Sequence, residues 1–174
     1  MAVIAANLEK QIKDALDKYH KNEYEDNKNN PKHLKILGDE MKKYFEENIE
    51  ITYGWAAALP PPVSTPDPVV MFDSTVKFPA FDLTAAKDLI TLASLVQVSI
   101  LGGTITHAAG FAVTPGTFLI KTPLAFPPSA DAGTALFSSI ILPTCIWVLT
   151  LINPAPLPGT HGPYTGAAAG MAVK

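Results

Sequence analysis

Charged residues are concentrated in the first third of this 174-residue chain. Residues 1–50 contain nine Lys and eleven Asp or Glu, whereas residues 51–174 contain only four Lys and five Asp. A free-standing domain usually carries many charges of both signs on its surface, and the longer part of the chain has too few for that. The sequence therefore predicts a charged head attached to a nearly neutral body whose surface contacts other protein.

The charged head has the periodicity of two amphipathic helices. Apolar side chains recur at helical spacing from residue 7 to residue 20, and Asn7 has the position of an N-cap. A second pattern begins near Pro31 and runs to about residue 49, after a polar, turn-favouring segment. We expect a helical hairpin over residues 1–50. Each helix has one apolar stripe that needs a partner surface, either in the body or in another subunit.

The body is predicted to begin with strands separated by a proline-rich connector. ITYGW, residues 51–55, is typical of a short strand, and the five prolines between residues 56 and 68 exclude regular helix or central strand there. Residues 69–81 alternate between apolar and polar side chains, which predicts a half-buried strand. Its apolar face would consist of Val70, Phe72, Val76 and Phe78.

An apolar helix is predicted over residues 84–101. Thr84 is the expected N-cap, with Asp88 in the first turns, where a carboxylate favours the helix dipole. The pair Gly102 and Gly103 should end the helix. Its apolar stripe would consist of Leu89, Leu92, Val96 and Ile100.

The remaining body is predicted to be less regular. From Thr104 onward, Thr, Gly and Pro favour short strands and turns, with Pro115–Gly116 as a turn. Residues 134–152 are either a second apolar helix or a helix broken at Pro143 into a strand. Residues 153–174 are rich in Pro, Gly and Ala and are expected to form irregular structure or an arm. The predicted fold class is α+β, with the hairpin at 1–50, a strand and connector at 51–68, and the body at 69–174.

Residues 135–152 contain no charged side chain, which raises the alternative of a membrane span. A second apolar stretch, residues 89–113, contains Gln97, His107 and a Gly-Gly pair, and Lys residues do not cluster beside either stretch. These features favour a protein interior and disfavour a membrane partner. The alternative is a small membrane protein with a soluble N-terminal head, such as a pore-forming lysis protein. The N-terminus lacks a basic segment before its apolar start, which favours assembly in the cytoplasm.

No motif in the chain indicates catalysis, a metal or a cofactor. Cys145 is the single cysteine, so no internal disulfide forms, and a buried hydrophobic role is expected for it. The four histidines have no metal-ligand spacing, and GTHGPYTG at residues 159–166 lacks the strand and helix that flank a phosphate loop. We therefore predict a protein that is not an enzyme and has no cofactor, metal or small-molecule substrate. An enzyme whose site leaves no motif is the third hypothesis.

Nucleic-acid binding is also disfavoured by composition. All thirteen basic residues are Lys, and the net charge is −3. Arg is the residue that most often makes bidentate contacts to phosphates and base edges, and no basic stripe takes its place.

The layout resembles that of small virion structural proteins of tailed bacteriophages. The segments ITYGWAAALPPPVSTPDPVVMF, FPAFDLTAAKDLITLASLVQ and GTHGPYTGAAAGM follow a short Lys/Glu-rich helical head. The resemblance implies an architectural part of a tail, baseplate, neck or capsid, present in many copies within the virion and assembled in the host cytoplasm. Its partners would be copies of itself and other virion proteins, and the resemblance brings no site residues.

Aromatic side chains are the expected anchors of the core or of subunit interfaces, because buried aromatic residues dominate such contacts. The candidates are Tyr53, Trp55, Phe72, Phe78 and Trp147.

Overall fold

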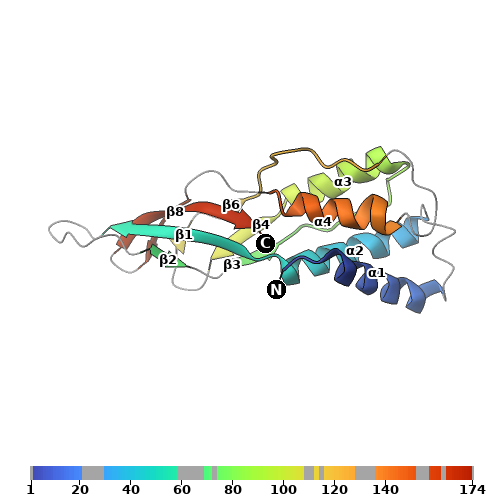
Figure 1. The fold of residues 1–174 in the computed structure, drawn as a ribbon, viewed down its shortest axis with the longest axis horizontal. Coiled ribbons are helices and arrows are strands. Elements are labelled where there is room, and N and C mark those ends of the chain that lie inside the picture. The colour runs from blue at the N-terminus through green and yellow to red at the C-terminus, as the bar shows by residue number, and fades with distance from the viewer. Residues whose placement is uncertain are drawn as a thin grey trace.

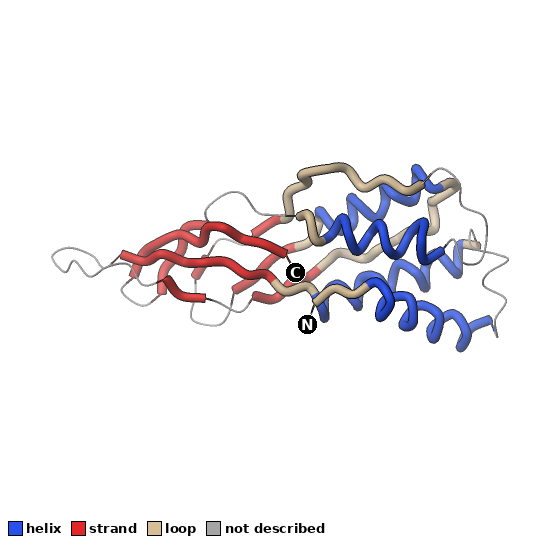
Figure 2. Tube along the Cα trace, viewed as in Figure 1, coloured by secondary structure: helices blue, strands red, loops and turns tan. Residues whose placement is uncertain are grey.

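The chain forms an α+β structure, as predicted, with helices gathered at one end and strands at the other (Figures 1 and 2). A computed structural model describes residues 2–20, 30–58, 69–71, 74–107, 112–113, 116–127, 136–151, 157–161 and 164–173. At the helical end of this elongated molecule, the charged N-terminal helices pack beside the charge-free helices of the body (Figure 1).

The N-terminal helical hairpin is confirmed. It consists of α1 (Ala5–His20) and α2 (Pro31–Asn48). Asn30 caps α2, since its side chain accepts a hydrogen bond from the Lys32 N–H at 3.0 Å, and Pro31 occupies the first turn. The prediction that Asn7 caps the first helix is wrong, because α1 begins two residues earlier and the Asn7 N–H donates to the carbonyl of Ile4.

The apolar stripes of the hairpin are covered by the body of the same chain. Leu8 and Ile12 of α1 and Phe45 of α2 are completely buried, and they belong to one hydrophobic cluster with body residues such as Leu83. The hydroxyl of Tyr44 closes the hairpin by hydrogen bonding to both the N–H and the carbonyl of Ile4, each at 2.9 Å. The hairpin and the body therefore share a single core.

A carboxylate on α2 connects the hairpin to the C-terminal end of strand β3 (Ser74–Lys77). Oε1 of Glu46 accepts hydrogen bonds at 2.8 Å from Lys42 and from the Phe78 N–H, and Lys77 lies 3.8 Å from Oε2. Only 14% of this side chain is exposed. Partial burial by itself raises the pKa of Glu46, but the two hydrogen bonds and the two lysine charges outweigh it and hold the pKa below its ordinary value of 4.5.

This contact predicts an acid-sensitive contribution to stability. Because the folded pKa of Glu46 lies below its unfolded value, its contribution is complete above pH 4.5 and disappears as the pH falls through the folded pKa. At pH 7, Glu46→Gln is expected to lower the free energy of unfolding by about 1–2 kcal/mol. Urea titrations between pH 7 and pH 3 should show the difference from wild type shrinking with acid. Asp39→Asn, which removes an exposed ion pair with Lys35, is the matched control; a difference that persisted unchanged at pH 3 would contradict the prediction.

The strands form two antiparallel sheets. The larger sheet has the order β2-β1-β8-β7-β5 and the smaller has the order β3-β4-β6. The larger sheet consists of β1 (Ile51–Ala58), β2 (Val69–Met71), β5 (Ala112–Val113), β7 (Leu157–His161) and β8 (Tyr164–Val173). The smaller sheet consists of β3 (Ser74–Lys77), β4 (Thr104–His107) and β6 (Gly116–Thr117).

The prediction of an irregular C-terminal arm is wrong. β8 is the central strand of the larger sheet, between β1 and β7, and Figure 1 shows it beside β1. It pairs with β1 from Ile51↔Val173 to Ala58↔Thr165, with one irregularity between Thr52 and Gly54. The hydrogen bonds of a sheet join backbone groups, so a strand of small Ala and Gly residues can occupy this position without an alternating apolar pattern.

The strand predicted over residues 69–81 is divided between the two sheets. β2 pairs with β1, whereas β3 pairs with β4, and residues 78–83 are extended but unpaired. The predicted alternation is correct where the side chains are described, because Val76 and Phe78 are buried while Thr75 and Lys77 are exposed. The predicted strand at residues 51–55 is confirmed, but it extends to Ala58, so the exclusion of a central strand is wrong for residues 56–58, which belong to a strand between β2 and β8. Residues 59–68 of the proline-rich connector and Pro115 of the predicted turn lie outside the described residues.

The predicted start of the body's first helix is wrong by five residues. α3 spans Leu89–Leu101, and its N-cap is Asp88, whose Oδ1 accepts hydrogen bonds from the N–H and hydroxyl of Thr91 at 2.7 and 2.8 Å. These bonds lower the pKa of Asp88. Thr84 instead donates its N–H and hydroxyl to Asp82 in a turn. The helix ends at Gly102, as the glycine pair predicts.

Residues 136–148 are helical throughout, which resolves the ambiguity at Pro143. A π-helical turn, η2 (Phe137–Ile141), leads directly into α4 (Leu142–Val148), and the Leu142 N–H donates to the Phe137 carbonyl. Pro143 has no N–H and its ring crowds the carbonyl one turn earlier, so a wider turn accommodates it. Within the described part of the chain, no helix is both long and apolar enough to cross a membrane.

Residues 118–127 follow β6 and contact both body helices; this segment is called the strap below. The Leu124 N–H donates to the side chain of Gln97 on α3 at 2.8 Å. The indole N–H of Trp147 on α4 donates to the Thr122 carbonyl at 2.6 Å. Two side chains of the strap, Phe118 and Leu124, are buried in the core. Gln97 and Trp147 therefore satisfy one backbone N–H and one carbonyl of the strap.

Candidate assembly surface

α3 contains no charged residue, yet one of its faces is exposed and carries aliphatic side chains. Ile90 and Val98 are 81% and 67% exposed, and Ser94 lies between them, one turn from each. Leu92, Val96 and Ile100 occupy the opposite side and are buried in the core. A helix that is apolar on nearly all sides is normally buried on all sides, so this outer face is a candidate contact surface. We call Ile90, Ser94 and Val98 the α3 stripe.

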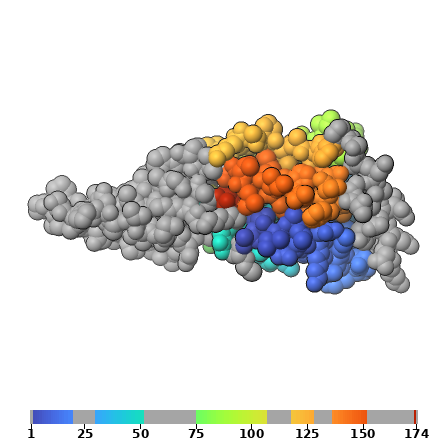
Figure 3. All heavy atoms as spheres, viewed as in Figure 1, coloured from blue at the N-terminus to red at the C-terminus, as the bar shows by residue number. Residues whose placement is uncertain are grey.

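α4 exposes a second aliphatic face. Leu142, Ile146 and Leu149 recur at helical spacing and are 36%, 57% and 41% exposed; we call them the α4 stripe. Between them on the sequence, Cys145, Trp147 and Val148 are buried. Figure 3 shows α4 on the surface, between α1 and the strap, so this helix is accessible to a partner.

The larger sheet carries no charged side chain in any of its five strands. Charged residues, especially Lys, are the usual protection of outer strands against pairing with another chain. The helical hairpin has the opposite character, with ion pairs Lys13–Glu9 and Lys35–Asp39 on its surface. The charge division seen in the sequence is thus a division between the hairpin and the rest of the chain, including the charge-free helices α3 and α4 beside it.

The five predicted aromatic anchors fall into three groups. Phe78 and Trp147 lie in the hydrophobic core, with Phe78 stacked on Phe118 at 5.6 Å between ring centroids. Tyr53 and Trp55 belong to β1, whose backbone pairing alone is described, and Phe72 lies outside the described residues. Neither Phe78 nor Trp147, the two anchors whose side chains are described, belongs to a surface stripe. The exposed candidates are therefore aliphatic rather than aromatic.

One feature of the sequence could have indicated the surface stripes, namely the absence of charged residues in both helical segments. Leu89–Leu101 and Phe137–Val148 contain no charged residue, so each helix has an apolar outer face in addition to its core face. A search for a single apolar stripe finds the core face and overlooks the other. The large aliphatic residues on the outer faces were not predicted as interface candidates.

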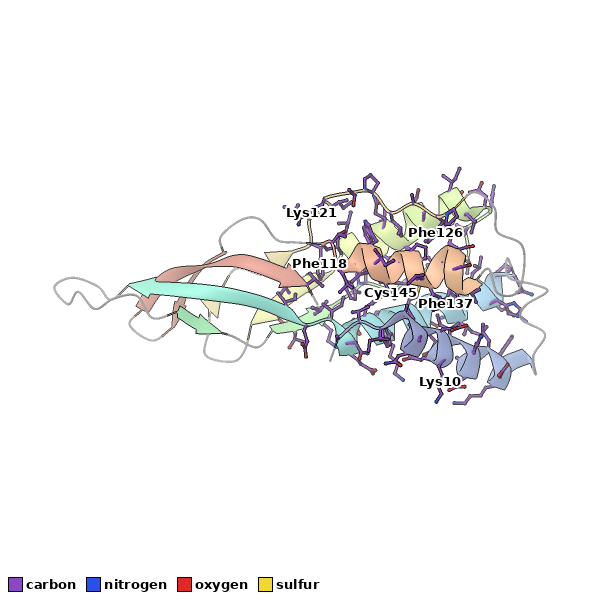
Figure 4. All side chains as sticks on the ribbon, in the orientation of Figure 1. Lys10, Phe118, Lys121, Phe126, Phe137 and Cys145 are labelled. Carbon is purple, nitrogen blue, oxygen red and sulfur yellow. The ribbon has the colours of Figure 1, made fainter. Side chains whose placement is uncertain are left out.

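In the part of the chain that the structure describes, the other polar and reactive groups do not define a reactive centre. Burial raises the pKa of the Cys145 thiol to about 12, which keeps it protonated and unreactive. Within the described residues, no group of three His, Cys, Asp or Glu side chains could hold a metal ion. Figure 4 shows Cys145 within the helical end, and Lys10 on the outside of α1.

An open groove of about 690 Å³ lies between α1 and α2. Its charged lining has equal numbers of Lys and acidic residues, Lys10, Lys18 and Lys43 against Asp14, Asp39 and Glu40. Gln11 donates to the Glu40 carboxylate at 2.7 Å across the groove. The balance of signs favours no class of charged ligand.

The chain matches no protein-family model, no curated protein and no solved structure.

Proposed function

We propose that this chain is a non-enzymatic structural subunit of a phage particle, a component of a tail, baseplate, neck or capsid. It would act by packing against copies of itself and against other virion proteins. The observation that carries the proposal is the pair of charge-free aliphatic stripes on α3 and α4, exposed on helices whose other faces already complete the core. The resemblance of the sequence layout to small virion proteins adds the phage context.

The size of the stripes favours repeated contacts over one strong contact. Burying the exposed parts of their five large aliphatic side chains would contribute roughly 4–8 kcal/mol, at about 1.5–3 kcal/mol for each fully buried side chain. Association costs about 4–15 kcal/mol in lost freedom. A single such contact is therefore weak, whereas a subunit held at several contacts in one particle gains from their combination.

Sedimentation of a lysate from the source cells tests the proposal. A virion subunit is expected to sediment with intact particles in a density gradient, and an antibody against the chain should decorate those particles in electron micrographs. Recovery of the chain only in the soluble fraction or only in the membrane fraction would contradict the proposal. The membrane fraction would favour the lysis-protein alternative.

Detergent-free purification gives a second, independent test. We expect the isolated chain to remain in solution without detergent and its mass by light scattering to rise with concentration, because the stripes associate weakly. A constant monomer mass at the highest accessible concentration would contradict self-association, and a chain recovered only in detergent micelles would contradict the proposed role.

A further inference from the structure

We propose that copies of this chain exchange a β-hairpin, so that β8 of one copy pairs with β1 of another. The hairpin consists of β7 and β8 and is called the β7–β8 hairpin below. This inference rests on the proposed structural role, and it names the partner, a second copy, and the segment that joins the two copies. The structure shows which strand covers the edge of β1, and every copy carries that strand.

β1 is the acceptor of this contact and depends on β8 for most of its pairing. Its register with β8 runs from Ile51↔Val173 to Ala58↔Thr165, whereas the described pairing with β2 covers only residues 54–56. Without β8, one edge of β1 would present unpaired N–H and carbonyl groups along the whole strand. Such an edge binds another strand through its backbone. β8 of a second copy has the same sequence and therefore fits the edge in the same register.

The β7–β8 hairpin is a unit that can move without losing its internal pairing. Its two strands pair with each other from Leu157↔Ala168 to His161↔Tyr164. It is joined to the rest of the sheet by β1 on one side and by two residue pairs with β5 on the other. The sequences of these strands contain no Lys, Asp or Glu, so their pairing does not depend on an ion pair. Backbone hydrogen bonds do not distinguish a strand of the same chain from one of a second copy.

One end of β8 also enters the hydrophobic core. Val173 is 8% exposed and its pairing partner Ile51 is 7% exposed, and both belong to the cluster that contains Phe45 of α2. Exchange therefore carries an apolar side chain of one copy into the core of the other. A link of this kind combines strand pairing with core burial, which the exposed stripes on α3 and α4 do not provide.

The closed and the exchanged forms have nearly the same contacts, because exchange replaces each contact within a chain by the identical contact between chains. Their ratio is therefore governed by concentration. A segment on a short connection has an effective concentration on the order of millimolar, so close neighbours in one particle can compete with it. The order of synthesis also favours exchange, since β1 precedes β8 by more than one hundred residues and is available to a neighbouring copy in the meantime.

A cysteine pair across β1 and β8 distinguishes the two forms. Ala56→Cys and Ala167→Cys replace two residues that are paired in the register, in a chain that carries Cys145→Ala and so has no other thiol. The concentrated chain is separated by size into monomer and dimer fractions, and each is oxidised and run on a denaturing gel without reductant. The monomer fraction should run as a monomer, because its disulfide forms within one chain. The dimer fraction should run as a dimer that reductant converts to monomer.

The matched control is Thr160→Cys with Thr165→Cys, a pair within the β7–β8 hairpin. These two residues stay in one chain in both forms, so both fractions of the control should run as monomers. The inference would be overturned by a dimer fraction of the β1–β8 pair that runs as a monomer, since its subunits would then be closed. It would equally be overturned if no dimer fraction formed at any accessible concentration.

Dilution of the wild-type dimer fraction tests the same inference without substitutions. An exchanged dimer separates only after β8 leaves β1, so it should keep its mass after dilution and return to monomer after unfolding in urea and refolding at low concentration. Dimers held by the surface stripes would separate at once on dilution, and that result would contradict the exchange. Either contrary result would leave the proposed function intact, because that function fails only if the chain does not sediment with particles.

Discussion

Trp147→Ala is expected to lower the free energy of unfolding by about 3–5 kcal/mol, the usual cost of removing a buried large aromatic side chain. Trp147 is 4% exposed and lies in the core of the helical end. Its indole N–H also supplies the hydrogen bond to the Thr122 carbonyl that connects α4 to the strap. Urea unfolding monitored by far-UV circular dichroism would measure the change.

Trp147→Phe separates the two contributions of this side chain. The variant keeps an aromatic ring but removes the donor to Thr122, so a loss of about 1–3 kcal/mol is expected. Lys121 lies exposed on the strap (Figure 4). A loosened strap should therefore be cleaved by trypsin after Lys121 faster than in wild type. Equal stability and equal cleavage rates in Trp147→Phe and wild type would show that the hydrogen bond does not hold the strap.

Gly38→Ala is expected to destabilise the protein by about 1–3 kcal/mol, the usual range for overpacking a filled site. Gly38 is buried in the middle of α2, where a Cβ would overlap the carbonyl oxygen of Phe81 and lie 3.3 Å from Cγ of Leu83. The obstacle includes backbone, so the helix and the extended segment would have to separate. Thermal and urea unfolding should both report the loss.

The direction of the stability change in Gly38→Ala distinguishes close packing from helix propensity. Helix propensity alone favours Ala over Gly by about 1 kcal/mol in a helix interior, so a helix without this close contact would be stabilised. Glu47→Ala, at an exposed position of the same helix, is the control and should change stability by less than about 0.5 kcal/mol. Stabilisation by Gly38→Ala would mean that α2 and residues 78–83 are not packed as closely as described.

The parts of the fold that could be predicted from sequence are those encoded within a few neighbouring residues. The hairpin followed from apolar residues at helical spacing, and Pro31 and Gly102 marked helix boundaries correctly. The exposure of Thr75 and Lys77 beside buried Val76 followed from alternation alone. The sequence could not decide between Thr84 and Asp88 as the start of α3, because both are good N-cap residues. The turn formed by Asp82 and Thr84 determined which of them was used.

The candidate assembly surface was only partly predictable. The shortage of charge in the body predicted that some surface meets other protein, but it did not say which surface. Helices without charged residues can be covered on one side or on all sides. The exposure of Ile90, Val98 and Ile146 depends on how many elements pack around α3 and α4, and that number is a property of the tertiary structure.

β8 and the helix through Pro143 show most clearly where local sequence stops being informative. YTGAAAGMAV contains helix-favouring Ala and flexible Gly, yet it is the central strand because its backbone pairs with β1, more than one hundred residues earlier, as in Gly54↔Ala169. Residues 136–148 stay helical because burial of Ile141, Cys145 and Val148 in the shared core outweighs the disruption at Pro143. The pattern of side chains along the sequence indicates which face of a segment is apolar. The partner that covers that face, or extends that strand, is selected by contacts between distant residues, which form only when the whole chain has folded.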